Sequence, residues 1–225
     1  GRARLTGDIH SPSYDDSSWK PATVVNGGPW PARPSDVETP GQREYPVKPI
    51  SVLAAGTSVP GGALRGDPLS MASDMRKAKL VPDPAATARA SALIGGARVV
   101  IEGKAGTARY VTFDFGMPVH GYPFLRLADA TPGVTVDFGY CEIPYSLHDG
   151  KAHVRTDGWI NTEGVVGPGY GDRYVTASGG QYMEFPDERT ARWMALHVRF
   201  PKDGRVVIED TGIVKSQYPV SMVGS

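Results

Sequence analysis

Two acidic side chains on one predicted strand, Asp137 and Glu142, are the first candidates for catalytic chemistry. Hydrolysis of a glycosidic bond with inversion needs two carboxyl groups about 6.5–9.5 Å apart, one acting as acid and one as base. Successive strand residues point to opposite faces, so this odd spacing separates the two groups unless a bulge intervenes. We therefore expect solvated or locally bonded carboxylates. Asp114, between Phe113 and Phe115, is expected at an outward strand position, and no catalytic residue is assigned.

The histidines and the single cysteine do not predict a metal site or a nucleophile. The five histidines show no close ligand spacing such as H-x-x-x-H, and residues 148–153 (HDGKAH) are typical of a polar turn. Cys141 has no CxxC partner and is expected to be a small strand residue. The glycine-rich stretch 167–171 contains a proline and precedes no helix, which argues against phosphate binding. We predict no metal and no cofactor.

A long interval without a clear strand, residues 143–171, is the best candidate for a binding surface. Loops of this length in compact domains usually bind ligands or contact other domains. Sugars bind where an aromatic face meets the apolar side of the ring and polar groups hold the hydroxyls, but aromatic residues and arginine are also enriched at protein interfaces. Docking against another domain, direct sugar contact and a plain ordered loop therefore stay open. The candidate carbohydrate-binding or interface residues are Tyr145, Asp149, Arg155, Asp157, Trp159, Asn161 and Tyr170.

Charge and composition exclude several classes of partner. With 24 basic and 24 acidic residues, nothing favours nucleic acid or an anionic membrane surface. No apolar run approaches the ~20 residues that span a bilayer. One cysteine rules out an internal disulfide, so the compartment, cytoplasmic or exported, stays open. The chain opens at Gly1 without a leader sequence, and we expect an internal piece or a processed product.

The elements that must position these residues are mostly strands. The 28 glycines and 20 prolines, with 40% hydrophobic residues, are typical of many short strands joined by turns. Two short helices are expected near 69–79 and 84–93. From residue 97 onward, alternation and turn signals predict an antiparallel β-sandwich. Its expected strands are 98–102, 109–115, 124–127, 134–142, 173–176, 181–185, 191–200 and 205–214.

Three groups of residues stand out along the chain: YDDSSWKPA (14–22); FDFG (113–116) with GYPFLRL (121–127); and YCE (140–142), DRY (172–174) and RW (192–193). In this order they resemble the β-sandwich region of bacterial α-L-rhamnosidases of glycoside hydrolase family 78. The first group resembles the turn of the family's N-terminal jelly-roll module, the second the start of its second sandwich, and the third follows in the family's order. A tryptophan, Trp193, stands where the family usually has tyrosine. The resemblance covers 14–22 and most of 109–220.

The resemblance implies a mainly β fold, a jelly-roll-like antiparallel sandwich with a partial second β module at the N-terminus. It implies that residues 1–53 end a galactose-binding-like module, 54–96 are a connector with possible short helices, 97–220 form the sandwich, and 221–225 begin a linker to a catalytic (α/α)6 barrel. The bacterial parent enzyme would remove terminal α-L-rhamnose using acidic residues on that barrel, and no position here matches them.

The partners implied are therefore a rhamnose-containing saccharide or glycoside and the barrel itself, on the same or a separate chain. Two alternatives are a stand-alone carbohydrate-binding module and a structural interaction domain without sugar binding.

Overall fold

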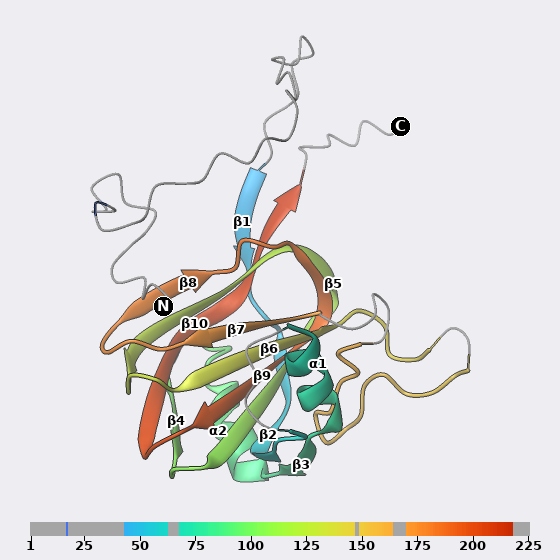
Figure 1. Cartoon of the computed structure of the whole chain (residues 1–225). Coiled ribbons are helices and arrows are strands. Elements are labelled where there is room, and N and C mark those ends of the chain that lie inside the picture. Colours follow the sequence, from blue (N-terminus) through green and yellow to red (C-terminus); the bar gives the residue numbers. More distant parts are fainter. Residues whose placement is uncertain (1–16, 18–42, 63–67, 147–148, 164–169, 218–225) are drawn as a thin grey trace, which may run out of the picture. The chain divides into compact units, whose positions relative to one another are not determined.

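The computed structural model describes residues 17, 43–62, 68–146, 149–163 and 170–217. Nearly all of them belong to one compact unit, Arg43–Gln217 (Figure 1). No helix in the described part of the chain is long and apolar enough to cross a membrane. The elements are β1 (Arg43–Val47), β2 (Ser51–Val59), α1 (Pro68–Lys77), β3 (Lys79–Pro82), α2 (Pro84–Ser91), β4 (Val99–Gly103), β5 (Thr107–Ala130), β6 (Thr135–Cys141), β7 (Gly171–Val175), β8 (Gln181–Glu184), β9 (Arg189–Phe200) and β10 (Gly204–Gln217).

A single antiparallel sheet curls around the long strand β5. The main strand order is β1-β10-β5-β9-β6-β7, with β2 and β8 also pairing with β5, β3 with β2, and β4 with β10. Residues 107–114 of β5 pair with β2 and β9, whereas residues 121–130 pair with β10 and β8. The sheet therefore has two sides that share β5 (Figure 1). The prediction of a mainly antiparallel β fold is confirmed.

The bend in β5 joins two segments that the sequence suggested as separate strands. The pairing of β5 with β9 is interrupted between Asp114 and Val119. Gly116 lies within this interruption at φ +77°, a conformation that costs other residues about 1–2 kcal/mol. The Asp114 Oδ1 atom accepts a hydrogen bond from the Gly116 N–H at 2.7 Å. This local turn lets one strand continue from one side of the sheet to the other.

The main core lies between the two sides of the curled sheet. Alternation places Val111 and Phe113 of β5 on the same face as Val136 and Phe138 of β6, with β9 between the two strands, and all four side chains are buried. The opposite side contributes Ile208, among others. The expected period-two pattern therefore directs one row of each strand into this core.

A second, outer layer covers the other face of β2, β5, β9 and β6. It consists of α1, β3 and the described part of 143–163. The outward row of β6 is buried as completely as its inward row, because this layer shields it from water. Trp193 is 5% exposed in this layer. The buried residues of this layer are Met75, Cys141, Ile160, Trp193 and Ala195, with Ala54, Ala78, Leu80 and Tyr110 beside them.

The segment 54–96 contains more than the two helices expected there. Helices α1 and α2 lie close to the predicted ranges, but the same segment supplies most of β2 and all of β3. The small residues at 54–56 suggested a linker, yet β2 pairs with β5 along its length. Asp83 caps α2, since its side chain accepts a hydrogen bond from the Ala85 N–H. The expected module at 1–53 lies mostly outside the described residues.

Candidate functional site

The predicted surface loop is held against the outer face of the sheet. The Tyr110 hydroxyl donates a hydrogen bond to the Asp157 carbonyl at 2.6 Å, and the Thr112 hydroxyl donates to the Gly158 carbonyl at 2.7 Å. On the other side, the Trp159 indole N–H donates to the Arg76 carbonyl of α1 at 2.7 Å. These hydrogen bonds give the loop a structural role, because they attach it to β5 and to α1.

Three of the predicted site residues form one cluster. The Arg155 guanidinium pairs with the Asp157 carboxylate at 2.7 Å and lies 4.7 Å from the centroid of the Trp159 ring. The Asn161 side chain instead accepts a hydrogen bond from the backbone N–H of Glu163. One face of the tryptophan is thus occupied by arginine, and its indole N–H is already bonded within the chain.

The remaining predicted residues have different surroundings. Tyr145 is 60% exposed. Asp149 pairs with Lys151, and that hydrogen bond lowers the pKa of the Asp149 carboxyl. The Tyr170 ring packs edge-on against the Tyr140 ring, with 5.6 Å between the ring centroids. This contact does not involve the cluster of Arg155, Asp157 and Trp159. No shared aromatic platform is formed by the described contacts, and a binding role for these seven residues stays a prediction.

The two carboxylates first considered for catalysis do not form an accessible pair. Asp137 is fully buried, contrary to the expectation of a solvated or locally bonded group. Its oxygens contact the Arg173 guanidinium at 2.5 and 2.9 Å and Arg199 Nε at 3.0 Å. Partial burial raises the pKa of Glu142, which suits an acid catalyst, but Asp137 is sealed beneath α1 and the loop. A substrate cannot reach both groups.

Asp114 is paired as well. Its carboxylate accepts from Arg192 Nε at 3.1 Å, while its side chain keeps 19% exposure. The outward strand position expected for Asp114 agrees with this partial exposure. The described residues contain no group of three or more His, Cys, Asp or Glu side chains that could hold a metal ion.

His197 lies beside the buried ion pairs and should make folding sensitive to acid. Its burial, and then the nearby Arg199 charge, lower its pKa to about 3. Below pH 6.5 the unfolded chain gains a proton here that the folded chain does not accept until about pH 3. The contribution of His197 to the free energy of unfolding is therefore fully present above pH 6.5. Protonation of the unfolded chain at this residue lowers the free energy of unfolding by about 2 kcal/mol between pH 7 and pH 5.

Urea unfolding of the wild type and of His197→Gln at both pH values tests this expectation. The variant should lose about 2 kcal/mol less than the wild type over the same interval. Equal losses in the two proteins would contradict the assignment to His197.

The Cys141 thiol should be inert in the folded protein. It is 3% exposed, and burial raises its pKa to about 11. The expectation of a small strand residue agrees with this burial. At pH 8, a disulfide reagent should react with it roughly a hundredfold more slowly than in the denatured chain, because only the thiolate reacts. Similar reaction rates of the thiol in native and denatured protein, followed by absorbance, would contradict this expectation.

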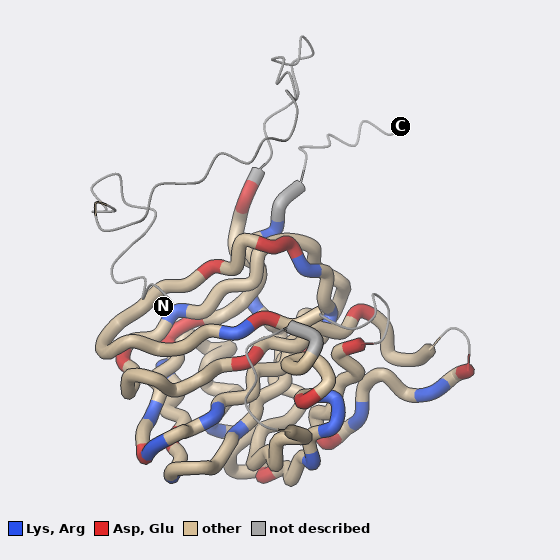
Figure 2. Tube along the Cα trace, viewed as in Figure 1, with Lys and Arg blue, Asp and Glu red and all other residues tan. Residues whose placement is uncertain are grey.

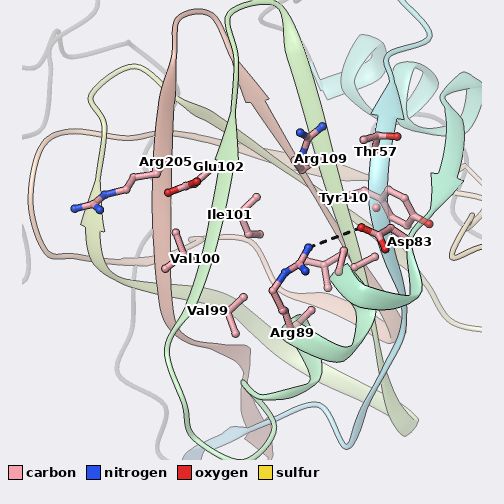
Figure 3. A pocket seen from close by; sticks show the side chains of 15 residues that line it. Thr57, Asp83, Arg89, Val99, Val100, Ile101, Glu102, Arg109, Tyr110 and Arg205 are labelled. Atoms are coloured by element: carbon pink, nitrogen blue, oxygen red, sulfur yellow. Dashed lines mark ion pairs between the residues drawn. The ribbon is translucent and has the colours of Figure 1, made fainter.

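A cleft of about 600 Å³ lies between β2, α2, β4 and the start of β5, a size common among ligand sites (Figure 3). Val99 and Ile101 of β4 point toward it, whereas Val100 and Glu102 point away, as strand alternation requires (Figure 3). Ala86 of α2 adds further apolar surface. The cleft thus has aliphatic walls on two sides.

Two arginines supply the charge of the cleft. Arg89 extends from α2 and contacts Asp83 at 3.8 Å (Figure 3). Arg109 lies opposite Thr57 in the pairing of β5 with β2. It belongs to the core-facing row of β5, with Val111, and is half-buried with no ion-pair or hydrogen-bond partner for its side chain among the described residues.

Sequence reasoning missed this cleft. The available signal was Arg109 itself, a charged residue on the same alternating row as Val111 and Phe113. The walls could not be inferred, because α2 and β4 are brought to β2 only by the curl of the sheet. Across the described unit, acidic and basic residues are otherwise interspersed (Figure 2).

Comparisons with known proteins give a likeness of fold. No protein-family model matches the sequence, and no curated protein matches it. A family 78 rhamnosidase of Bacillus sp. GL1 superposes with a TM-score of 0.50 and 22% identity, over 66% of this chain and 14% of that one. The chain therefore spans a small part of that enzyme, and the likeness shows the fold alone.

Two further similarities are weaker. A Klebsiella oxytoca rhamnosidase with rhamnose bound gives a TM-score of 0.41 at 12% identity, over 83% of this chain and 33% of that one. A fucolectin from striped bass (Morone saxatilis) serum gives 0.31 at 13%, over 76% and 50%. Neither supports an inference about this chain.

Proposed function

We propose that this chain is a non-catalytic β-sandwich module of an α-L-rhamnosidase-like glycoside hydrolase. One observation carries the proposal: the ordered motifs from 113 to 193 belong to a single folded unit, and that unit resembles in fold part of a family 78 rhamnosidase. The parent enzyme would release terminal α-L-rhamnose through acidic residues on a helical barrel, and the module would support that barrel.

The sites of the module favour support over catalysis. Asp137 is closed to substrate, and Asp114 is paired with an arginine. The loop cluster of Arg155, Asp157 and Trp159 is bonded within the chain but lies on the outer layer. We propose that this cluster, with exposed Tyr145, forms a contact surface for the barrel, with substrate contact as a further role.

We also propose a revised boundary for the module. Strands β1 and β2 pair with β10 and β5, so the sandwich begins near Arg43 instead of residue 97. Residues before this point would keep their proposed place at the end of a galactose-binding-like module, and 221–225 would lead toward the barrel.

An activity assay of the purified 225-residue chain tests the non-catalytic role. A chromogenic α-L-rhamnoside should show no hydrolysis above the buffer rate. Turnover at an enzyme-like rate, roughly 1 s⁻¹ or more, would overturn the proposal. The variant Glu142→Gln serves as a control, because Glu142 is the only carboxylate of the described residues whose pKa is raised. Any trace activity that persists in this variant has another source.

A further inference from the structure

We propose that the cleft between β2, α2, β4 and β5 binds the carboxylate of an acidic sugar, with Arg109 as the principal anchor. The sugar class rests on the proposed function, whereas the carboxylate rests on the geometry of the cleft alone. The parent activity concerns a neutral sugar at a site outside this chain, so the cleft would be a separate binding site.

The strongest observation is the unpaired charge of Arg109. Its side chain starts from the core-facing row of β5, between Thr57 of β2 and Val198 of β9, and no carboxylate pairs with it among the described residues. Partly burying a charge without a partner is unfavourable. A planar carboxylate could accept two parallel hydrogen bonds from this guanidinium, which makes it the matching ligand group.

Arg89 can supply a second positive charge. Its only ion-pair partner in the described structure, Asp83, is 3.8 Å away, and the two side chains are 66% and 50% exposed. Exposed pairs of this kind contribute about 0–1 kcal/mol. Asp83 is also held by the Ala85 N–H as the cap of α2, so Arg89 can turn toward a ligand while Asp83 stays in place.

The aliphatic walls of the cleft fit a small sugar ring better than a flexible polyanion. Ile101, with the edge of the largely buried Val99, offers an aliphatic surface for the C–H side of a pyranose (Figure 3). Thr57, the strand partner of Arg109, adds a hydroxyl to the lining of the cleft. Tyr110 borders the cleft but is 1% exposed, and its hydroxyl is bonded to Asp157. Without an exposed aromatic face, the charge must provide most of the affinity.

A neutral sugar fits less well. Glu102, the other carboxylate bordering the cleft, points away from the cavity (Figure 3), so the inward-facing groups are two guanidiniums and the engaged Asp83 carboxylate. A neutral ligand would leave Arg109 without a counter-charge. An acidic sugar neutralises it.

Titration of the 225-residue chain with D-glucuronate and D-glucose, followed by amide chemical shifts, tests the inference. Glucuronate should bind saturably and at least about tenfold more tightly than glucose, with shifts centred on β2, α2 and β4. Arg109→Ala should lose at least about tenfold in glucuronate affinity. Asp83→Asn should bind glucuronate more tightly, because the cap is retained while the competing charge is removed.

Arg205→Ala is the matched control. Arg205 also borders the cleft, but it points away from the cavity and pairs with Asp129 at 2.9 Å (Figure 3). Its removal should leave glucuronate affinity unchanged. Equal losses in Arg109→Ala and Arg205→Ala would indicate a general charge effect and overturn the site.

Further outcomes separate this inference from the proposed function. Equal affinity for glucose and glucuronate, or no saturable binding of glucuronate, overturns the inference whatever the parent enzyme does. Cyclohexanecarboxylate binding as tightly as glucuronate overturns the sugar class. The proposed function is judged by rhamnosidase activity of the parent protein, which Arg109→Ala should not change.

Discussion

Replacing Asp137 by asparagine should lower the free energy of unfolding by about 3–5 kcal/mol. Asparagine keeps the size of the side chain, so the loss comes from the charge. Arg199, whose side chain is 8% exposed, would keep only Asp74, at 3.8 Å, as a charged partner among the described residues, and Arg173 would face a neutral amide instead of the Asp137 carboxylate. Breaking a buried ion pair on one side costs this much because the other charge stays buried. Urea unfolding followed by circular dichroism measures the change.

Asp129→Asn is the control for the buried pair. Asp129 also pairs with an arginine, Arg205, but the two side chains are 42% and 54% exposed. Exposed pairs contribute about 0–1 kcal/mol, so this variant should stay close to the wild type. Similar small losses in both variants would mean that water reaches Asp137 and that the outer layer does not seal it.

Gly158→Ala should destabilise the protein by about 2–4 kcal/mol, the sum of a backbone and a packing effect. Gly158 has φ +85°, a conformation that other residues adopt only with strain. An added Cβ would also lie 2.8 Å from Tyr110 Cε2 and 3.0 Å from Ala54 Cβ. Both neighbours are buried, so neither can move away freely. Thermal or urea unfolding measures the loss.

Gly150→Ala separates the backbone effect from the packing effect, because this variant has backbone strain without a steric clash. Gly150 has φ +67° in the same loop, but an added Cβ would meet no atom within 4 Å. This variant should lose only the backbone cost of about 1–2 kcal/mol. If Gly158→Ala lost no more than Gly150→Ala, the packing of the loop on the outer face of the sheet would be contradicted.

Alternation made the inner core predictable. In 109–115 every second residue from Arg109 onward faces the core, and the expected strands at 134–142 and 191–200 correspond closely to β6 and β9. Each of these strands carries its own signal, because the period of two is local to the strand. The resemblance to the rhamnosidase region added the class of fold that the superposition supports.

The outer layer and the cleft were not predictable, for a shared reason. Both depend on which segments far apart in the sequence come together. The burial of Asp137 requires α1 and the loop to cover β6, and nothing in 134–142 shows that cover. Ala54 and Ala55 suggested a linker because small residues carry no pattern, yet both belong to β2, and the Ala55 carbonyl accepts a hydrogen bond from the Asp83 N–H at 2.9 Å.

The most direct test of the central claim is the intact mass of the native protein that carries this sequence, measured on the fraction that hydrolyses a chromogenic α-L-rhamnoside. We expect rhamnosidase activity and this sequence to purify together, in a protein or complex several-fold larger than the 24.0 kDa of this chain. A native protein of 24.0 kDa that purifies apart from rhamnosidase activity would contradict it.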